Sequence, residues 1–324
     1  MKCVVEKKIS KYLFIINGTY ILYRIDLYSK KILFLAERRI KKSKCKIKIY
    51  DLDQKKLYTR SAQLRFIPNL EGISQYSTEK SLYLCGSNKP SIHSSQTTGS
   101  YLFRYDLEND FKQPSVLVNS AYVHYNPMIV LVNNDILVVI GGKNQIFCEK
   151  YSISLNNWRK IPILPEERYQ GCLLVNQRDS NLYLFGGTTE GKFNSSILSL
   201  NFRSIGGWDR ILLKGHDYLL KRKNSISFCF GGEKDNIFIC GGETDSNGGN
   251  EYIVEYEPIN KKIRKQFIKS ELTKAKFKNQ TIIDFDGRFF SFCDTDDNIY
   301  IIEKKTFNIQ IINTRDISIN NFND

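Results

Sequence analysis

The sequence lacks any apolar run long enough to span a bilayer, and it lacks a signal peptide at its beginning. A membrane-spanning helix needs about 18 or more consecutive apolar residues. Charged residues, namely Lys2, Glu6, Lys7 and Lys8, interrupt the first eighteen positions before such a stretch can form. We therefore expect no membrane contact and a location in the reducing cytoplasm.

Histidine is scarce, and sites built on it are correspondingly disfavoured. The three histidines, His93, His124 and His216, stand at no metal-ligand spacing and beside no nucleophile motif. The eight cysteines form no CxxC pair. GxSxG, phosphate-loop and dinucleotide fingerprints are also missing. The sequence thus predicts no catalytic residue, no cofactor and no metal, and we interpret the histidines as loop residues.

Helical periodicity is missing as well. No segment of about 10 to 15 residues between the apolar strands repeats with a helical period, which excludes a doubly wound α/β fold. Aromatic residues make up 13% of the chain and are mostly Tyr and Phe. Such residues favour pleated strands. The prediction is an all-β protein.

Positive charge is present in excess, with 48 Lys and Arg against 34 Asp and Glu and a net charge of +14. This balance attracts acidic proteins, nucleic acid or anionic surfaces without choosing among them. A solvated basic surface is the simpler interpretation. The alternating segment 44–50 is typical of a solvated edge strand. Nucleic-acid binding is disfavoured because the aromatic residues are expected in the core.

A strand that ends in two glycines recurs along the chain. The strong copies are 136–142, 182–187 and 236–242, and 82–87 and 288–294 are degenerate copies. Cys85, Cys240 and Cys293 occupy equivalent places late in three of these strands, where a small apolar core residue is expected. A period of about 45 to 55 residues indicates repetition of one supersecondary unit.

A second feature repeats with the same period. A large residue followed by a short polar one begins a hairpin at residues 50, 105, 151, 200, 256 and 302, and in four copies an apolar residue returns seven positions later. Turn-forming residues separate the two positions, and another hairpin precedes each glycine-bearing strand. Each repeat is therefore predicted to be a four-stranded antiparallel unit.

Stacking such units in a ring buries their faces, which predicts a β-propeller occupying residues 1–324 as a single domain. Six blades are preferred. Seven remain open, because Ile25 and Asp26, with Ile32 seven positions after Ile25, form an additional hairpin pattern. One terminus, either 3–9 or 307–313, is expected to close the ring by adding a strand to the unit at the other end.

These residues resemble the kelch-repeat family most strongly over about 130–270. In that family an apolar strand ends in Gly-Gly, an aromatic residue follows, and a tryptophan comes six or seven residues later. The residues that match, which we expect to be structural, are Gly141, Gly142, Tyr151, Trp158, Gly186, Gly187, Trp208, Gly241, Gly242 and Tyr256. A WD40 propeller is the alternative, because Trp208-Asp209 and Gly215-His216 each occur once. We expect the aromatic residues to pack between blades.

The resemblance implies a protein-interaction role more readily than an enzyme. Many kelch proteins are ubiquitin-ligase adaptors with a BTB or F-box domain ahead of the repeats, which we do not find here, and others associate with the cytoskeleton. Copper oxidases of the family need histidines that are scarce here. Sugar-acid epimerases need Arg and Glu or Gln at the channel mouth, for which Arg168, Glu190, Arg222 and Glu243 are candidates.

Loops mounted on a scaffold are where binding residues concentrate. The candidate partner-binding rim consists of Arg168, Tyr169, Glu190, Arg222, Lys223, Glu243 and Lys276. Three of its cations, Arg168, Arg222 and Lys276, stand at equivalent places and would form a positive mouth. The simpler interpretation, which we prefer, is that the arginines brace a neighbouring blade. The prediction is a scaffold for an acidic protein partner, with an epimerase or an anion or nucleic-acid binder as alternatives.

Overall fold

The computed structural model describes the strands and most of their connections. The described residues are 12–17, 21–26, 31–35, 44–51, 56–63, 72–77, 81–87, 99–106, 115–203, 206–213, 217–229, 235–245, 252–266, 273–277, 283–285, 289–293, 298–303 and 308–313. The strands before residue 64 and the two strands between 283 and 293 are described by their backbone alone.

The chain folds into a series of antiparallel sheets. The first contains β1 (Tyr12–Asn17), β2 (Ile21–Asp26), β3 (Lys31–Leu35), β4 (Lys44–Asp51) and β5 (Lys56–Gln63). The second contains β6 (Ile73–Ser77), β7 (Ser81–Gly86), β8 (Tyr101–Asp106) and β9 (Ser115–Val116). The third contains β10 (Met128–Val132), β11 (Ile136–Ile140), β12 (Cys148–Ser152) and β13 (Asn157–Ile161).

Three more sheets have four strands each, as predicted, whereas the first sheet has five, one more than predicted. They are β14 (Cys172–Asn176), β15 (Asn181–Phe185), β18 (Ile197–Asn201) and β19 (Asp209–Ile211); β21 (Ile226–Cys229), β22 (Ile237–Cys240), β24 (Ile253–Glu257) and β25 (Lys262–Gln266); and β26 (Ile283–Phe285), β27 (Phe289–Cys293), β28 (Asn298–Glu303) and β29 (Ile309–Asn313). Two small pairs are added, β16 (Thr188–Thr189) with β17 (Lys192–Phe193) and β20 (Arg222–Lys223) with β23 (Glu243–Thr244), together with the 3₁₀ helix η1 (Asp217–Leu220).

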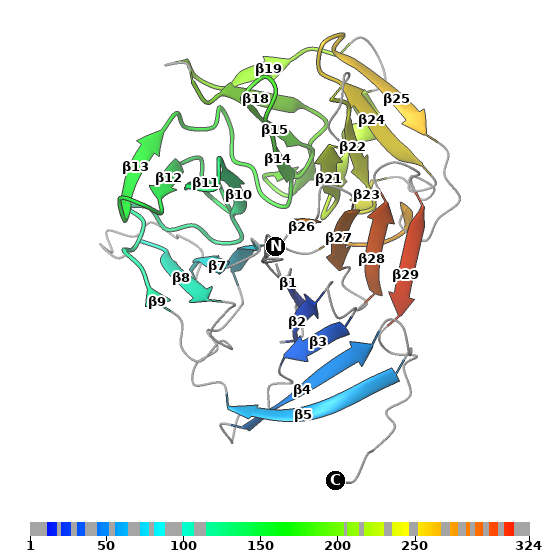
Figure 1. Ribbon diagram of the computed structural model, residues 1–324. Coiled ribbons are helices and arrows are strands. Elements are labelled where there is room, and N and C mark those ends of the chain that lie inside the picture. The colour runs from blue at the N-terminus through cyan, green and yellow to red at the C-terminus, as the bar shows by residue number, and fades with distance from the viewer. Residues whose placement is uncertain are drawn as a thin grey trace, which may run out of the picture.

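The sheets are arranged radially, with their first strands toward a common centre and their last strands at the perimeter (Figure 1). Contacts between neighbouring sheets run from β1 to β6, β6 to β10, β10 to β14 and β14 to β21, and β1 also contacts β27. The all-β prediction is confirmed, and the arrangement is propeller-like.

The predicted hairpin register is also confirmed. The large residue and the apolar residue seven positions later are direct cross-strand partners in all four copies, namely Tyr50 with Leu57, Tyr151 with Trp158, Tyr256 with Ile263, and Ile302 with Ile309. A β-hairpin places opposite residues at fixed separations once the turn length is set. The seven-residue interval within each repeat therefore predicts the pairing of the two outer strands.

The first and last sheets bear on two expectations, the additional hairpin at Ile25 and the exchange of a terminal strand. Ile25 pairs with Ile32 inside the first sheet, so this hairpin belongs to the same sheet as β4 and β5 and forms no separate unit. Every described sheet is built from strands in chain order. The predicted exchange of a terminal strand is therefore not seen for β29, which joins its own sheet, and 3–9 lies outside the described residues.

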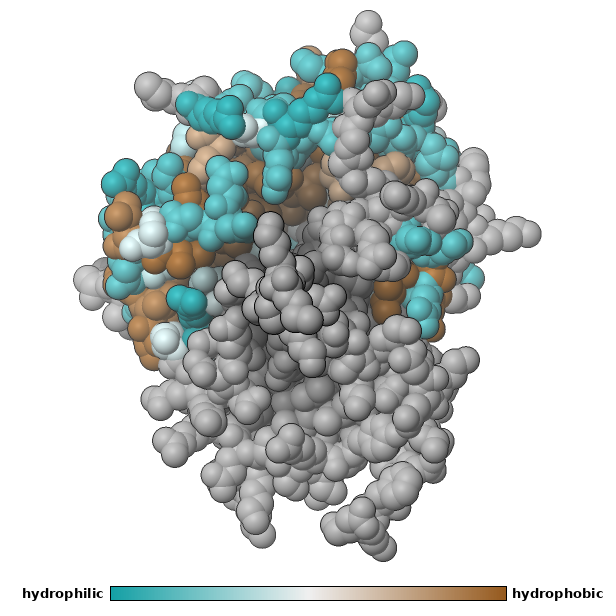
Figure 2. Space-filling model, in the orientation of Figure 1, coloured by the Kyte–Doolittle hydropathy of each residue, from teal (hydrophilic) through white to brown (hydrophobic). Residues whose placement is uncertain are grey.

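Hydrophobic residues fill the space between neighbouring sheets. One cluster joins the sheet of β6 to that of β10, a second joins β10 to β14, a third joins β14 to β21, and a fourth joins β21 to β28. Figure 2 shows hydrophobic residues lying deeper than the hydrophilic side chains that surround them. Each sheet thus buries its face against its neighbours, as the stacking argument predicted.

The predicted core cysteines are buried where their side chains are described. Cys85 and Cys240 are fully buried, like Ile140 and Phe185 at the equivalent positions, and the side chain of Cys293 lies outside the described residues. Cys172 is buried too. Burial raises the pKa of its thiol to about 11, so it stays protonated and unreactive at neutral pH.

The two tryptophans connect neighbouring sheets, as predicted. Trp158 packs against the cluster between the β6 and β10 sheets, and its indole Nε1–H donates to the carbonyl of Val118 at 2.6 Å. Trp208 packs between the β10 and β14 sheets and donates to the carbonyl of Pro162 at 2.9 Å. Each indole therefore holds the connection that leaves the preceding sheet.

We expect Trp158→Ala to lower the free energy of unfolding by about 1–3 kcal/mol, because it removes the inter-sheet packing of a partly buried side chain and its hydrogen bond to Val118. Trp158→Phe should lose less, since it removes the indole donor but keeps an aromatic ring. Thermal unfolding followed by circular dichroism measures both. An unchanged melting curve for Trp158→Ala would contradict the inter-sheet assignment.

Candidate partner-binding mouth

The paired glycines join each sheet to the next. The second glycine of each pair donates its backbone N–H to a carbonyl of the following sheet, from Gly142 to Arg168 at 3.1 Å, from Gly187 to Arg222 at 2.6 Å and from Gly242 to Ala275 at 2.7 Å. These hydrogen bonds bring the connection that enters each sheet against the glycine-bearing strand end of the previous one. One face of the radial arrangement of sheets is built in this way.

Arg168 and Arg222 lie beneath this face, and neither is exposed. Arg168 donates to the Gly186 carbonyl at 2.8 Å, and Arg222 donates to the Gly241 carbonyl at 3.2 Å. Their side chains are 0% and 1% exposed. Two of the three cations expected at a positive mouth are therefore turned into the protein, where each binds the first glycine of its own sheet's pair.

His124 occupies the equivalent position ahead of the preceding sheet; it lies in the loop between β9 and β10, as expected, but it is buried. Its Nδ1 lies 2.7 Å from the Gly141 carbonyl, and its Nε2 lies 3.3 Å from Glu149 Oε2. The Glu149 carboxylate also accepts the backbone N–H groups of Ala121 and Tyr122 at 3.0 Å. The spacing to the glycine pair was an available signal, because His124, Arg168 and Arg222 precede their first glycines by 17, 18 and 19 positions.

Glu166 is the carboxylate that accompanies Arg168. Its Oε1 accepts hydrogen bonds from Arg168 at 2.5 Å and from Asn194 and Arg210 at 3.0 Å. Partial burial alone would raise the pKa of this carboxyl, but the Arg168 guanidinium and the donated hydrogen bonds outweigh burial and lower the pKa below its usual value of 4.5. The connection into the β14 sheet is thereby tied to the β17–β18 connection and to β19.

The lowered pKa of Glu166 makes part of the stability acid-sensitive. A carboxyl whose pKa is lower in the folded state stabilises the fold above its unfolded pKa, and this contribution disappears as the pH falls through the folded value. We expect Glu166→Gln to be less stable than the wild type at pH 7, with the difference shrinking below about pH 4.5. Melting temperatures measured from pH 7 to pH 3 test this, and a constant difference would contradict it.

The exposed members of the predicted rim gather around β20 and β23. Lys223 Nζ lies 3.2 Å from Glu243 Oε2, and Lys276 Nζ lies 3.8 Å from Glu243 Oε1. The side chains of Lys223 and Lys276 are 29% and 54% exposed. Partial burial raises the pKa of the Glu243 carboxyl, but the two lysines outweigh burial and lower the pKa below its usual value. We call Lys223, Glu243 and Lys276 the lysine-glutamate cluster.

The remaining rim residues lie on the neighbouring sheet. Tyr169 is half-buried and forms a backbone bridge to Thr188, the residue after the glycine pair. Glu190 is exposed in the turn between β16 and β17. Phe193, at the end of β17, lies with its ring 5.5 Å from Lys223 Nζ. The β16–β17 hairpin therefore reaches the lysine-glutamate cluster.

Sequence reasoning missed a set of equivalent residues that precede the first strands of consecutive sheets. Gly72, Asn126, Gln170 and Asn224 occupy the corner before the first strand of four consecutive sheets, and all have a left-handed backbone, with φ of 75°, 54°, 56° and 55°. We call them the corner residues. A signal was present, because Asn or Gln follows His124, Arg168 and Arg222 at the second position each time.

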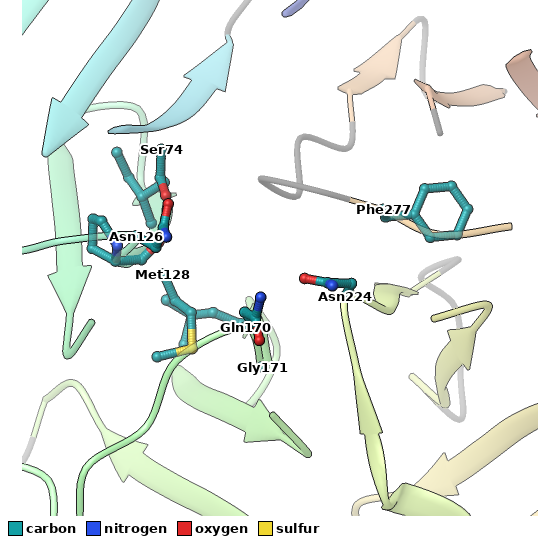
Figure 3. Close-up of a pocket in the computed structure, with 10 residues that line it drawn as sticks. Ser74, Asn126, Met128, Gln170, Gly171, Asn224 and Phe277 are labelled. Carbon is teal, nitrogen blue, oxygen red and sulfur yellow. The ribbon is translucent and has the colours of Figure 1, made fainter. Parts of the chain in front are cut away.

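Three of the corner residues, Asn126, Gln170 and Asn224, border a small hollow that opens to solvent. Asn126, Gln170 and Asn224 surround it together with Met128 and Phe277, and the Asn224 side chain points toward Gln170 (Figure 3). The other lining residues are Ser74, Pro127, Ile129, Gly171 and Leu173. None of the lining side chains is charged, so the hollow differs in chemistry from the lysine-glutamate cluster.

Within the described part of the chain, no helix is long and apolar enough to cross a membrane. The same residues contain no group of three or more His, Cys, Asp and Glu side chains placed to hold a metal ion.

Comparison with known proteins identifies a shared fold but does not assign the chain to a family. No family model matches the chain. No curated protein matches it in sequence. Among solved structures, the structure of YjhT matches with a TM-score of 0.59 at 11% identity, covering 94% of this chain and 97% of YjhT. At this identity the match shows the fold alone, and the chain shares the overall fold of YjhT over nearly its whole length.

Proposed function

We propose that the six sheets are the blades of a kelch-type propeller and that the protein is a non-catalytic interaction module. Its mouth, formed by the corner residues and the lysine-glutamate cluster, receives a protein partner. The observation that carries this proposal is the different placement of the candidate residues. Arg168 and Arg222 are buried and hydrogen-bonded to backbone carbonyls, whereas Lys223 and Lys276 extend from the same face.

This placement favours binding over epimerase chemistry. An epimerase-like site requires Arg and Glu or Gln side chains that converge on a substrate, and both candidate arginines are occupied in bracing their own sheets. Catalytic groups also need to reach the reacting atoms at hydrogen-bond distance. Glu243 is paired with two lysines, and Glu190 lies in a separate exposed turn.

The lysine-glutamate cluster suits an acidic side chain of the partner. Two ammonium groups face one carboxylate, which leaves a net positive charge on an exposed surface of a protein whose overall charge is +14. A partner carboxylate that replaces Glu243 as the acceptor would form charge-assisted hydrogen bonds. Such contacts steer association and set specificity.

We expect the double substitution Lys223→Glu and Lys276→Glu to abolish partner binding without unfolding the protein, because both side chains are partly exposed. The wild type, this variant and Lys262→Glu, which changes an exposed lysine on the perimeter strand β25, are used to capture partners with mass-spectrometric identification. A specific partner should be retained by the wild type and by Lys262→Glu, and lost by the double variant.

Three outcomes would contradict this function. Equal capture by all three proteins would remove the lysine-glutamate cluster from the binding surface. Capture of nucleic acid with a steep dependence of affinity on salt would indicate a nucleic-acid binder. Turnover of a sugar acid by the purified protein, measured by proton NMR, would indicate an enzyme.

A further inference from the structure

The corner residues are joined to one another by backbone hydrogen bonds, and one bond of the series is missing. The N–H of Asn126 donates to the carbonyl of Gly72 at 2.9 Å, the N–H of Asn224 donates to Gln170 at 2.9 Å, and the N–H of Phe277 donates to Asn224 at 2.8 Å. Between Asn126 and Gln170, both of which the structure describes, the corresponding bond from the Gln170 N–H to the Asn126 carbonyl is not formed.

The hollow lies at this interruption. Both Asn126 and Gln170 line it. Met128 of β10, Leu173 of β14, and Gly171, which directly precedes β14, also contribute to its wall. The side-chain amides of Asn126, Gln170 and Asn224 stand at its mouth (Figure 3). The Gln170 N–H and the Asn126 carbonyl, which make no backbone bond with each other, therefore belong to two residues that line this hollow, and three carboxamides border it.

From this geometry we propose that the hollow binds a peptide group of an extended segment of the partner, which completes the interrupted series of backbone bonds. A peptide group carries one acceptor and one donor, so it can accept from the Gln170 N–H and donate to the Asn126 carbonyl. Backbone pairing of this kind is how extended peptides add to an unpaired edge. The site rests on the proposed function, for which it names the chemistry of the partner segment.

The surroundings of the hollow favour a neutral peptide over a charged ligand. None of its lining side chains is charged, and a desolvated charge without a counter-charge is unfavourable. Carboxamide side chains both donate and accept, which matches the two sides of a peptide group. Met128 and Leu173 are nearly fully buried and give the hollow an apolar base that suits a small aliphatic side chain next to the bound peptide group.

The free protein tests the interruption directly. Backbone amides without a hydrogen bond exchange with solvent rapidly, whereas bonded amides are protected. We expect the Gln170 amide to exchange at least ~100-fold faster than the amides of Asn126, Asn224 and Phe277, measured by hydrogen exchange and NMR. Equal protection of all four amides would overturn the proposal, whatever the binding experiments show.

Binding is tested with N-acetyl-triglycine methylamide as the probe. Its addition should shift the Gln170 amide resonance saturably and slow the exchange of that amide. Asn126→Gly, Gln170→Gly and Asn224→Gly remove one carboxamide each, and glycine tolerates the left-handed backbone at these positions. Each should weaken probe binding at least ~5-fold, since each removes a hydrogen-bonding group. Asn134→Gly is the matched control, because Asn134 is left-handed with φ of 57° in an exposed turn between β10 and β11.

The possible results separate this site from the proposed function. Binding of maltotriose or sodium sulfate at Gln170, with no response to the peptide probe, would overturn the peptide assignment. Equal binding by the corner variants and Asn134→Gly would also overturn it. Loss of partner capture in the Lys223 and Lys276 double variant with a protected Gln170 amide would leave the proposed function standing without this site. Unchanged partner capture by the double variant, together with a rapidly exchanging Gln170 amide that binds the probe, would leave the peptide site standing and contradict the role of the two lysines.

Discussion

We expect Arg222→Met to lower the free energy of unfolding by about 3–5 kcal/mol, because it removes three hydrogen bonds that the guanidinium donates to backbone carbonyls. The Arg222 guanidinium donates to the carbonyls of Leu219 at 3.0 Å, Gly241 at 3.2 Å and Tyr252 at 3.4 Å, and it lies 4.9 Å from the centre of the Tyr252 ring. Methionine fills similar space but supplies no N–H group. Denaturant unfolding of the purified variant measures the loss.

The adjacent residue provides a matched control. Lys221 is 42% exposed and pairs with the exposed Asp245 at 3.4 Å, so Lys221→Met removes a surface ion pair and should cost at most about 1 kcal/mol. Arg222→Lys keeps the positive charge but loses the planar arrangement of donors, and we expect an intermediate loss. If Arg222→Met were as stable as Lys221→Met, the bracing role of the buried arginine would be wrong.

This expected result also shows where sequence reasoning stopped. The repeat spacing placed Arg168 and Arg222 at equivalent positions, and the structure agrees, since each enters its sheet next to a glycine pair. Spacing along the chain does not fix the direction of a long side chain. The bracing interpretation explains why both arginines are buried. It predicted contact with a neighbouring sheet, however, whereas each arginine donates to a glycine of its own sheet.

The hairpin registers were predictable because they depend on local pattern. A large residue, a short turn and a second apolar residue seven positions later determine which residues face each other, as in the pairs of Tyr151 with Trp158 and Tyr256 with Ile263. The corner residues depend instead on contacts between sheets. Asn126, Gln170 and Asn224 share a carboxamide two positions after His124, Arg168 and Arg222, but they differ in the residue that follows, and this weak pattern alone does not show that they share a left-handed backbone.

Gly241→Ala is expected to cost more than the same change at any open glycine. A Cβ added at Gly241 would lie 2.4 Å from the Ala275 carbonyl oxygen and 2.5 Å from the Phe277 ring, and its φ of 63° already disfavours a side chain. The added methyl group would push the β21 sheet and the connection into the last sheet apart. That movement also breaks the 2.7 Å bond from the Gly242 N–H to Ala275. We expect a loss of at least about 3 kcal/mol.

Gly191→Ala separates the two causes. Gly191 also has a left-handed backbone, with φ of 78°, but an added Cβ there meets no atom within 4 Å. Its substitution carries only the conformational penalty, about 1–2 kcal/mol. Denaturant unfolding of both variants therefore measures the close approach between sheets as a difference. Equal losses would mean that Gly241 is required only for its backbone angle, and a larger loss at Gly241 would show that the glycine pair is the joint at which one sheet meets the next.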